Sequence, residues 1–270
     1  MHGAAWLATG FVLRRLLVFA ALVVFVHPAL AADKCMPFSG ERMSFDVSWE
    51  FINAGSATMS IVSVQQGWHT QISARTNRVL DLFKKVRDTI TATGTCLDGR
   101  IQSLSFDVEQ HENRYHSIKQ TRFDWQRNQV RYTQKGETTV YDVPAGHLSV
   151  VDAFLLTRSM PLRPGDEFRI PVFDSRKRYQ VLVRVLNKRP MLRVPWGGVV
   201  PCVILEPKLK TEGIFSSKGT MKIWVTDDER HIPVKVVAKI KFGHIVGTLE
   251  AYEGPVFIQK GRSLRSELNP

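Results

Sequence analysis

The residues best suited to metal chemistry are two histidines and a glutamate close together in the chain. His111 and Glu112 are adjacent, and His116 lies five residues after His111. A zinc protease site needs two histidines four residues apart on a helix, because that spacing places both on one face. Five residues along a strand-like run are expected to put the two side chains on opposite faces. We therefore predict no metal site.

Other catalytic patterns are equally weak. The chain contains no Gly-x-Ser-x-Gly elbow and no glycine-rich phosphate loop. The acidic run Asp227-Asp228-Glu229 is more typical of a hairpin turn, where carboxylates accept hydrogen bonds from backbone amides. We predict no catalytic residue, no cofactor and no enzymatic activity.

The N-terminus has the pattern of an export signal. Arg14 and Arg15 precede the uncharged apolar run 16–26, and Ala29-Leu30-Ala31 has the small-x-small form of a cleavage site. We predict a signal peptide at 1–31, a single β-rich domain at 32–260, a disordered tail at 261–270 and a periplasmic location. The alternative is an uncleaved signal that anchors the protein in the inner membrane.

Export bears on the three cysteines, because an oxidising compartment favours disulfides. Cys35 precedes the first expected strand, and Cys96 is expected in a turn. Cys202 lies within the apolar run 199–205. Of the three pairings open to these residues, we predict Cys35–Cys96, with Cys202 as a buried and unreactive thiol.

The chain is basic, with a formal net charge of +12. Without Arg14 and Arg15 there are 35 basic and 25 acidic residues, a net charge of +10. Such a charge suits anionic partners such as lipid head groups, while nucleic acid is not expected for an exported protein. The alternative is a solvated basic surface.

One basic stretch also carries apolar side chains, which suits an interface with a membrane surface or an amphipathic ligand. The alternative is a solvated hairpin end. The candidate ligand or membrane-surface residues are Arg184, Lys188, Arg189, Arg193 and Trp196.

The elements that would position these residues are mostly strands. The stretch 219–252 contains three alternating runs separated by two turns, and 42–51 is another clear strand, followed by an expected turn at Asn53-Ala54-Gly55. The range 77–85 is ambiguous between a helical turn and a loop. Ser149 and Asp152 form a capping box that begins a helix at 149–159, which Pro161 ends. We predict an all-β, mainly antiparallel fold: one strongly curved sheet, a half-barrel or incomplete barrel, with this helix against its concave side.

Several short motifs resemble the exported bacterial family known as domain of unknown function 3108. The resemblance implies an exported, mainly β envelope protein and supplies no catalytic residues. The helix departs from the family pattern at Val150-Val151. The matching pieces are 38–49, 54–57, 152–158, 162–166 and 223–228 with Arg230, Ile232 and Pro233.

The final meander is also similar to the closing strands of outer-membrane lipoprotein carriers, over about 30 residues. We expect non-enzymatic binding of a lipid-like or amphipathic envelope component inside the β-shell. The alternative is a structural or interaction protein with a filled core, which recruits an envelope protein through a basic face.

Overall fold

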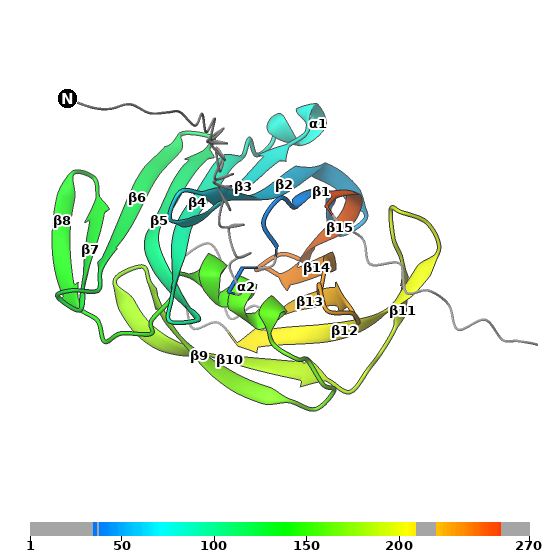
Figure 1. Ribbon diagram of the computed structural model, residues 1–270. Helices are drawn as coiled ribbons and strands as arrows, with labels where there is room; N and C mark the ends of the chain where they lie inside the picture. Colours follow the sequence, from blue (N-terminus) through cyan, green and yellow to red (C-terminus); the bar gives the residue numbers. More distant parts are fainter. Residues whose placement is uncertain (1–34, 37, 209–219, 255–270) are drawn as a thin grey trace, which may run out of the picture. The chain divides into compact units, whose positions relative to one another are not determined.

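The computed structural model describes residues 35–36, 38–208 and 220–254. These residues form fifteen strands and two helices (Figure 1). The elements are β1 (Arg42–Trp49), β2 (Ile52–Val64), β3 (Gly67–Thr76), α1 (Arg78–Asp81), β4 (Arg87–Leu97), β5 (Arg100–Glu112), β6 (Tyr115–Asp124), β7 (Gln129–Gln134), β8 (Glu137–Asp142), α2 (Val150–Ser159), β9 (Glu167–Asp174), β10 (Lys177–Leu186), β11 (Met191–Arg193), β12 (Val199–Lys208), β13 (Met221–Thr226), β14 (Pro233–Lys239) and β15 (His244–Glu253).

The strands pair into a single antiparallel sheet built from two meanders, an N-terminal one of β1–β8 and a C-terminal one of β9–β15. Its order is β8-β7-β6-β5-β4-β3-β2-β1-β15-β14-β13-β12-β10-β9, and β11 pairs with β12 outside this path. The β1–β15 ladder joins the two meanders, with Trp49 opposite Ile245 at one end and Arg42 opposite Glu253 at the other. The sheet therefore depends on one pairing between strands about 200 residues apart in sequence.

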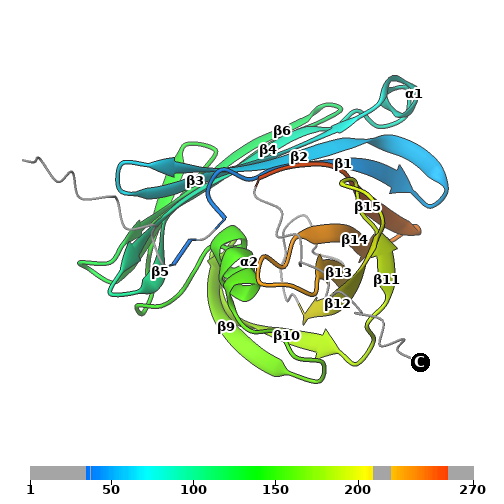
Figure 2. The ribbon, with the colours of Figure 1, turned by 45° about the vertical axis from the view of Figure 1, so that its right-hand side comes forward.

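The sheet curls but does not close, because its path ends at β8 and β9. Figure 2 shows the C-terminal meander curling around α2, while β1–β6 form a longer, flatter part. The edge of β9 is covered in part by the chain before α2: Leu148 donates to the Pro171 carbonyl at 3.0 Å, and Phe173 donates to the Leu148 carbonyl at 3.0 Å. This confirms the expected incomplete barrel.

Helix α2 lies inside the curl, against β9 and parts of β4 and β5 (Figure 2). The Ser149 hydroxyl accepts from the Asp152 amide at 3.0 Å, as the capping box predicts. The helix is enclosed on most sides, and this space is filled by side chains. Its buried residues are Val151, Asp152, Ala153, Leu155, Thr157 and Arg158.

The core consists mainly of the inward-facing side chains of the alternating strands. In β10, for example, Val181, Val183 and Val185 are buried, as the period of two requires. Near α2 the core also contains Phe38 and Phe173, both completely buried.

Several local expectations are corrected. The first turn lies at Glu50-Phe51, where Glu50 has a φ of 52°, and not at 53–55. The ladder register shifts at Ser48, which faces Asn53, so that Ala54 is an extra residue in β2. Residues 53–55 thus form a β-bulge and not a turn. Both structures require a residue with unusual backbone angles, which Gly55 supplies with a φ of 154°. The ambiguous range 77–85 contains the single helical turn α1.

The cysteine pairing is confirmed: Cys35 and Cys96 form a disulfide, with their α-carbons 5.8 Å apart. Cys96 lies at the end of β4 rather than in the turn itself. Cys202 is free and buried, and burial raises the pKa of its thiol to about 11. At neutral pH this thiol is therefore protonated and a poor nucleophile.

The predicted signal peptide at 1–31 and the tail at 261–270 lie outside the described residues. Within the described part of the chain, neither helix has the length and apolar character that a membrane crossing requires.

Candidate functional site

The five residues of the predicted basic interface differ in their surroundings. The Arg184 guanidinium pairs with Glu167 at 2.7 Å on the surface, and Arg189 pairs with Asp227. These two cations are therefore partly neutralised by acidic neighbours.

Trp196 is half-buried and packs against the core. Its ring meets Tyr252 edge-on, with 5.5 Å between the ring centroids, and Tyr252 in turn contacts the buried Glu41. Lys188 and Arg193 are exposed. A ligand role for this stretch stays a prediction, and its geometry favours it less than the surface described next.

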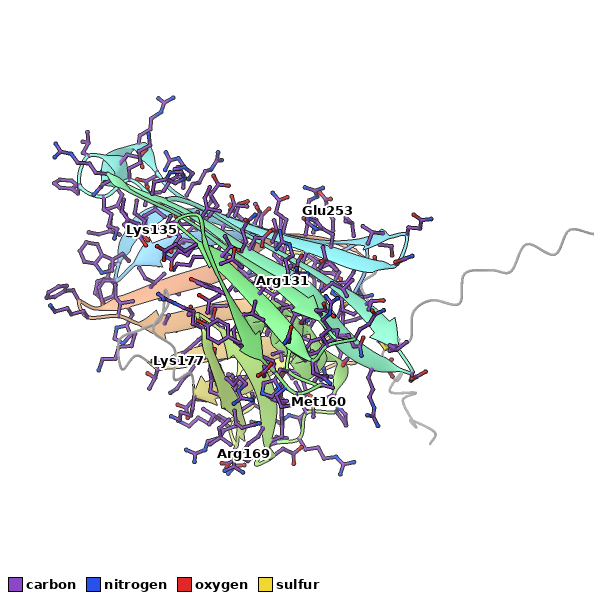
Figure 3. The ribbon with its side chains drawn as sticks, turned by 90° about the vertical axis from the view of Figure 1, so that its left-hand side faces the viewer. Arg131, Lys135, Met160, Arg169, Lys177 and Glu253 are labelled. Carbon is purple, nitrogen blue, oxygen red and sulfur yellow. A yellow bond between two sulfur atoms is a disulfide. The ribbon has the colours of Figure 1, made fainter. Side chains whose placement is uncertain are left out.

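A stronger candidate lies at one end of the sheet, where the turns β14–β15, β1–β2, β3–β4 and β5–β6 come together. Figure 3 shows these turns at the left of the view, at the same end of the sheet. The side chains there are apolar and largely exposed: Phe51 is 98% exposed, Leu82 82% and Phe83 78%. We call this set the apolar rim, and it consists of Phe51, Ile52, Val79, Leu82, Phe83, Tyr115 and Phe242.

Hydrogen bonds join the first three turns of the rim. Trp49 Nε1 donates to the Phe242 carbonyl at 2.8 Å, which links β1 to the β14–β15 turn. The Asn77 side-chain amide donates to the Asn53 carbonyl at 2.7 Å, which links the start of α1 to β2.

The fourth turn is joined in the same way. The Lys85 amide donates to the Asn113 side chain at 2.7 Å and so links the α1 loop to the β5–β6 turn. The rim is therefore one connected surface.

Basic residues accompany the rim. Its turn segments, residues 49–53, 77–87, 112–115 and 239–244, contain seven basic and three acidic residues, a net charge of +4. One of the cations, Lys241, lies 5.2 Å from the centre of the Phe242 ring. Exposed aromatic side chains among lysines and arginines are typical of surfaces that meet a membrane interface.

Sequence reasoning missed the rim, although its signal was present. Phe51 falls at the end of the expected strand 42–51, and Leu82 and Phe83 fall in the range 77–85, which is ambiguous between a helical turn and a loop. The informative pattern is local: Leu82-Phe83 directly precedes Lys84-Lys85, and Phe242 follows Lys241. Apolar side chains in turns beside lysines are exposed, because turns lie at the surface.

A buried ionic cluster lies at the C-terminal end of α2. Arg158 is completely buried, and its Nη2 lies 2.9 Å from Glu41 Oε2. Arg230 also pairs with Glu41, at 2.5 Å, and Tyr252 donates to the same carboxylate at 2.9 Å. Phe38 covers the group, with its ring centre 3.9 Å from the Arg158 guanidinium carbon. The cluster ties the chain before β1, helix α2, the β13–β14 turn and β15 together.

A buried carboxyl fixes the other end of α2. Asp152 accepts from Trp68 Nε1 at 3.0 Å, from the Ser103 hydroxyl at 2.5 Å and from the Ser149 hydroxyl at 2.9 Å. An acidic group at the N-terminus of a helix and a basic group at its C-terminus both interact favourably with the helix dipole and so stabilise the helix. Burial raises the pKa of Asp152 to about 6, against the lowering effect of these hydrogen bonds.

This raised pKa predicts a pH dependence of stability. Asp152 binds a proton more tightly in the folded than in the unfolded state, so its contribution is fully present below about pH 4 and is lost as pH rises through 6. The loss is about 3 kcal/mol for roughly two pKa units. Urea unfolding measures the free energy of unfolding of Asp152→Asn and of the wild type between pH 4 and 8. Relative to the wild type, the variant should become more stable by about this amount as the pH rises. The exposed Asp142→Asn serves as the matched control and should run parallel to the wild type.

The histidines excluded by spacing are in fact neighbours. His111 and His116 are direct cross-strand partners on β5 and β6, and their rings stack with 4.1 Å between the centroids. The expectation of opposite faces is wrong, because a two-residue turn at Asn113-Arg114 separates them and reverses the chain. Counting residues assigns faces only within one strand.

An open antiparallel sheet curled around a buried helix defines a β-barrel-like protein. The chain belongs to the family described as Protein of unknown function (DUF3108), whose model matches residues 44–250. This confirms the family resemblance seen in the sequence.

A solved structure shares this fold. It is described as a beta-barrel-like protein of domain of unknown function DUF1849 from Brucella abortus, with a TM-score of 0.53 and 10% identity over 79% of this chain and 96% of that chain. This likeness shows the fold alone. No curated protein matches the sequence. The similarity of the final meander to lipoprotein carriers stays a prediction.

Proposed function

We propose that this protein is a non-catalytic component of the cell envelope that binds anionic lipid surfaces through the apolar rim. The observation that carries the proposal is the exposure of aromatic and aliphatic side chains in four connected turns with a net charge of +4. Insertion of these side chains into the interface removes apolar area from water, and the lysines and arginines meet the head groups.

The interior supports surface binding over carriage of a lipid beneath the helix. Leu155 is completely buried, and its neighbours Val151 and Ala153 are only 6% exposed. Side chains of the core fill the concave side of the sheet around α2. The binding site of this proposal is therefore the end of the sheet and not an internal cavity.

The rim predicts a measurable loss of vesicle binding. The double variant Leu82→Ser/Phe83→Ser should bind vesicles of phosphatidylglycerol and phosphatidylcholine at least about 10-fold more weakly, because even partial burial of two such side chains exceeds 1.4 kcal/mol. Co-sedimentation of the mature protein measures this. Both side chains are exposed, so the fold should tolerate the change.

The matched control is Val64→Ser/Leu97→Ser, which removes two exposed apolar side chains, 47% and 53% exposed, from the opposite end of the sheet. It should bind like the wild type. Vesicles of phosphatidylcholine alone and high salt should both weaken binding, because the charge term is lost or screened. If the wild type does not bind anionic vesicles, or if both double variants weaken binding equally, the proposal is wrong.

The filled interior favours one competing function, recruitment of another envelope protein through a basic face. In that case a periplasmic extract should yield a partner whose capture depends on Arg193 and Lys188 and survives Leu82→Ser/Phe83→Ser. Vesicle binding by the purified protein distinguishes the two functions, since it requires no partner.

A further inference from the structure

The β5–β6 hairpin brings three metal-ligating side chains together on its exposed face. His111 and His116 are direct partners across the hairpin, with 19° between their ring planes. The His111 amide donates to the carboxylate of Asp88, on the neighbouring strand β4, at 3.0 Å and makes no hydrogen bond to β6. The pair therefore occupies a non-hydrogen-bonded position of the ladder, where opposite side chains approach most closely.

Glu109 completes the group. It lies two residues before His111 on the same face of β5, and its carboxylate is 3.7 Å from His111 Nε2. One ligand atom from each of the three residues lies within 4.8 Å of the other two. Within the described part of the chain, this is the one place where three such side chains converge in this way.

We infer that Glu109, His111 and His116 form a site for a divalent transition metal ion. Zinc binds imidazole nitrogen at about 2.0–2.1 Å, so two nitrogens on a tetrahedral ion are about 3.3 Å apart. The stacked rings must turn about their side-chain bonds to aim two nitrogens at one ion. All three side chains are exposed, so rotamer changes are not opposed by packing.

The ligand types decide which ions the site takes. Two imidazoles and one carboxylate suit zinc, copper and nickel, whereas calcium and magnesium prefer oxygen ligands alone. Three protein ligands leave a position open for water or for a group on another molecule. By the order of divalent stabilities, copper binds more tightly than zinc or nickel at this site.

The test uses the chelator-treated mature protein, titrated with zinc chloride or copper chloride at pH 7.5 by calorimetry and by dialysis with elemental analysis. We expect one equivalent of bound metal, with copper tighter than zinc. His111→Ala and His116→Ala should each weaken zinc binding by at least about 10-fold, since each removes one of three ligands. Glu109→Gln should weaken it less.

The matched control is His147→Ala, which removes a histidine whose ring nitrogen lies 2.8 Å from the Pro144 carbonyl. It should leave the binding curve unchanged. Absence of binding at micromolar zinc, or binding that survives His111→Ala and His116→Ala, overturns the inference. The measurement contains no lipid, so its outcome is independent of vesicle binding.

Discussion

Replacement of Glu41 by glutamine should destabilise the protein by about 3–5 kcal/mol, which is the range for removing one partner of a buried ion pair. Glu41 is 1% exposed and lies between two buried guanidinium groups, those of Arg158 and Arg230. Glutamine keeps the shape and one acceptor but removes the negative charge. Two positive charges would then lie together in a region with little water to solvate them.

Urea unfolding, followed by circular dichroism, measures this loss. The matched control is Glu167→Gln, since Glu167 pairs with Arg184 at 2.7 Å but is 42% exposed. An exposed pair of this kind contributes only about 0–1 kcal/mol. Equal effects of the two substitutions would contradict the assignment of Glu41 as the counter-ion of the buried cluster.

A double-mutant cycle sharpens the test. Arg158→Met alone leaves Glu41 with the remaining cation and removes the hydrogen bonds that the Arg158 guanidinium donates to the carbonyls of Arg230 and His231, at 2.9 and 3.0 Å. If Glu41 and Arg158 act as a pair, the double variant should be more stable than the sum of the two single losses predicts.

The sequence predicts well what local pattern controls. Alternation in β10 and β13 identifies strands because each has one face in the core. The Ser149–Asp152 capping box locates the start of α2 because its hydrogen bond lies within a single turn. The acidic run after β13 forms the predicted turn, in which Asp228 accepts from the Arg230 amide at 3.0 Å.

The parts of the fold and of the candidate site that the sequence does not predict depend on contacts between residues distant in the chain. Nothing near Trp49 indicates that Ile245 lies opposite it, although this ladder joins the two meanders. The ion cluster unites residues 41, 158 and 230, each of which looks like an ordinary surface charge in its own segment. The histidine pair and the rim were missed for a related reason, because hairpin turns bring together side chains that a count along the chain separates.

The second large effect concerns the disulfide. Cys35→Ser/Cys96→Ser should lower the free energy of unfolding by about 4 kcal/mol, because the bridge closes a loop between residues 61 apart in sequence and restricts the unfolded chain. The bridge also holds the chain before β1 at the end of β4. That chain contains Phe38, which is completely buried over Arg158, and ends beside Glu41.

This position predicts a coupling between the bridge and the ion cluster. Once the bridge is removed, residues 38–41 are held by burial, by hydrogen bonds to β2 and by the contacts of the Glu41 carboxylate. Glu41→Gln removes the ion pairs from this set and should then allow the segment to detach locally. Hydrogen exchange measures this opening at the Gly40 amide, which donates to the Ile61 carbonyl at 2.7 Å. We expect the triple variant to lose protection at Gly40 well before the sheet unfolds, while Cys202→Ala retains it. If the triple variant protects Gly40 as strongly as the amides of the sheet, the bridge and the cluster do not act together on this segment.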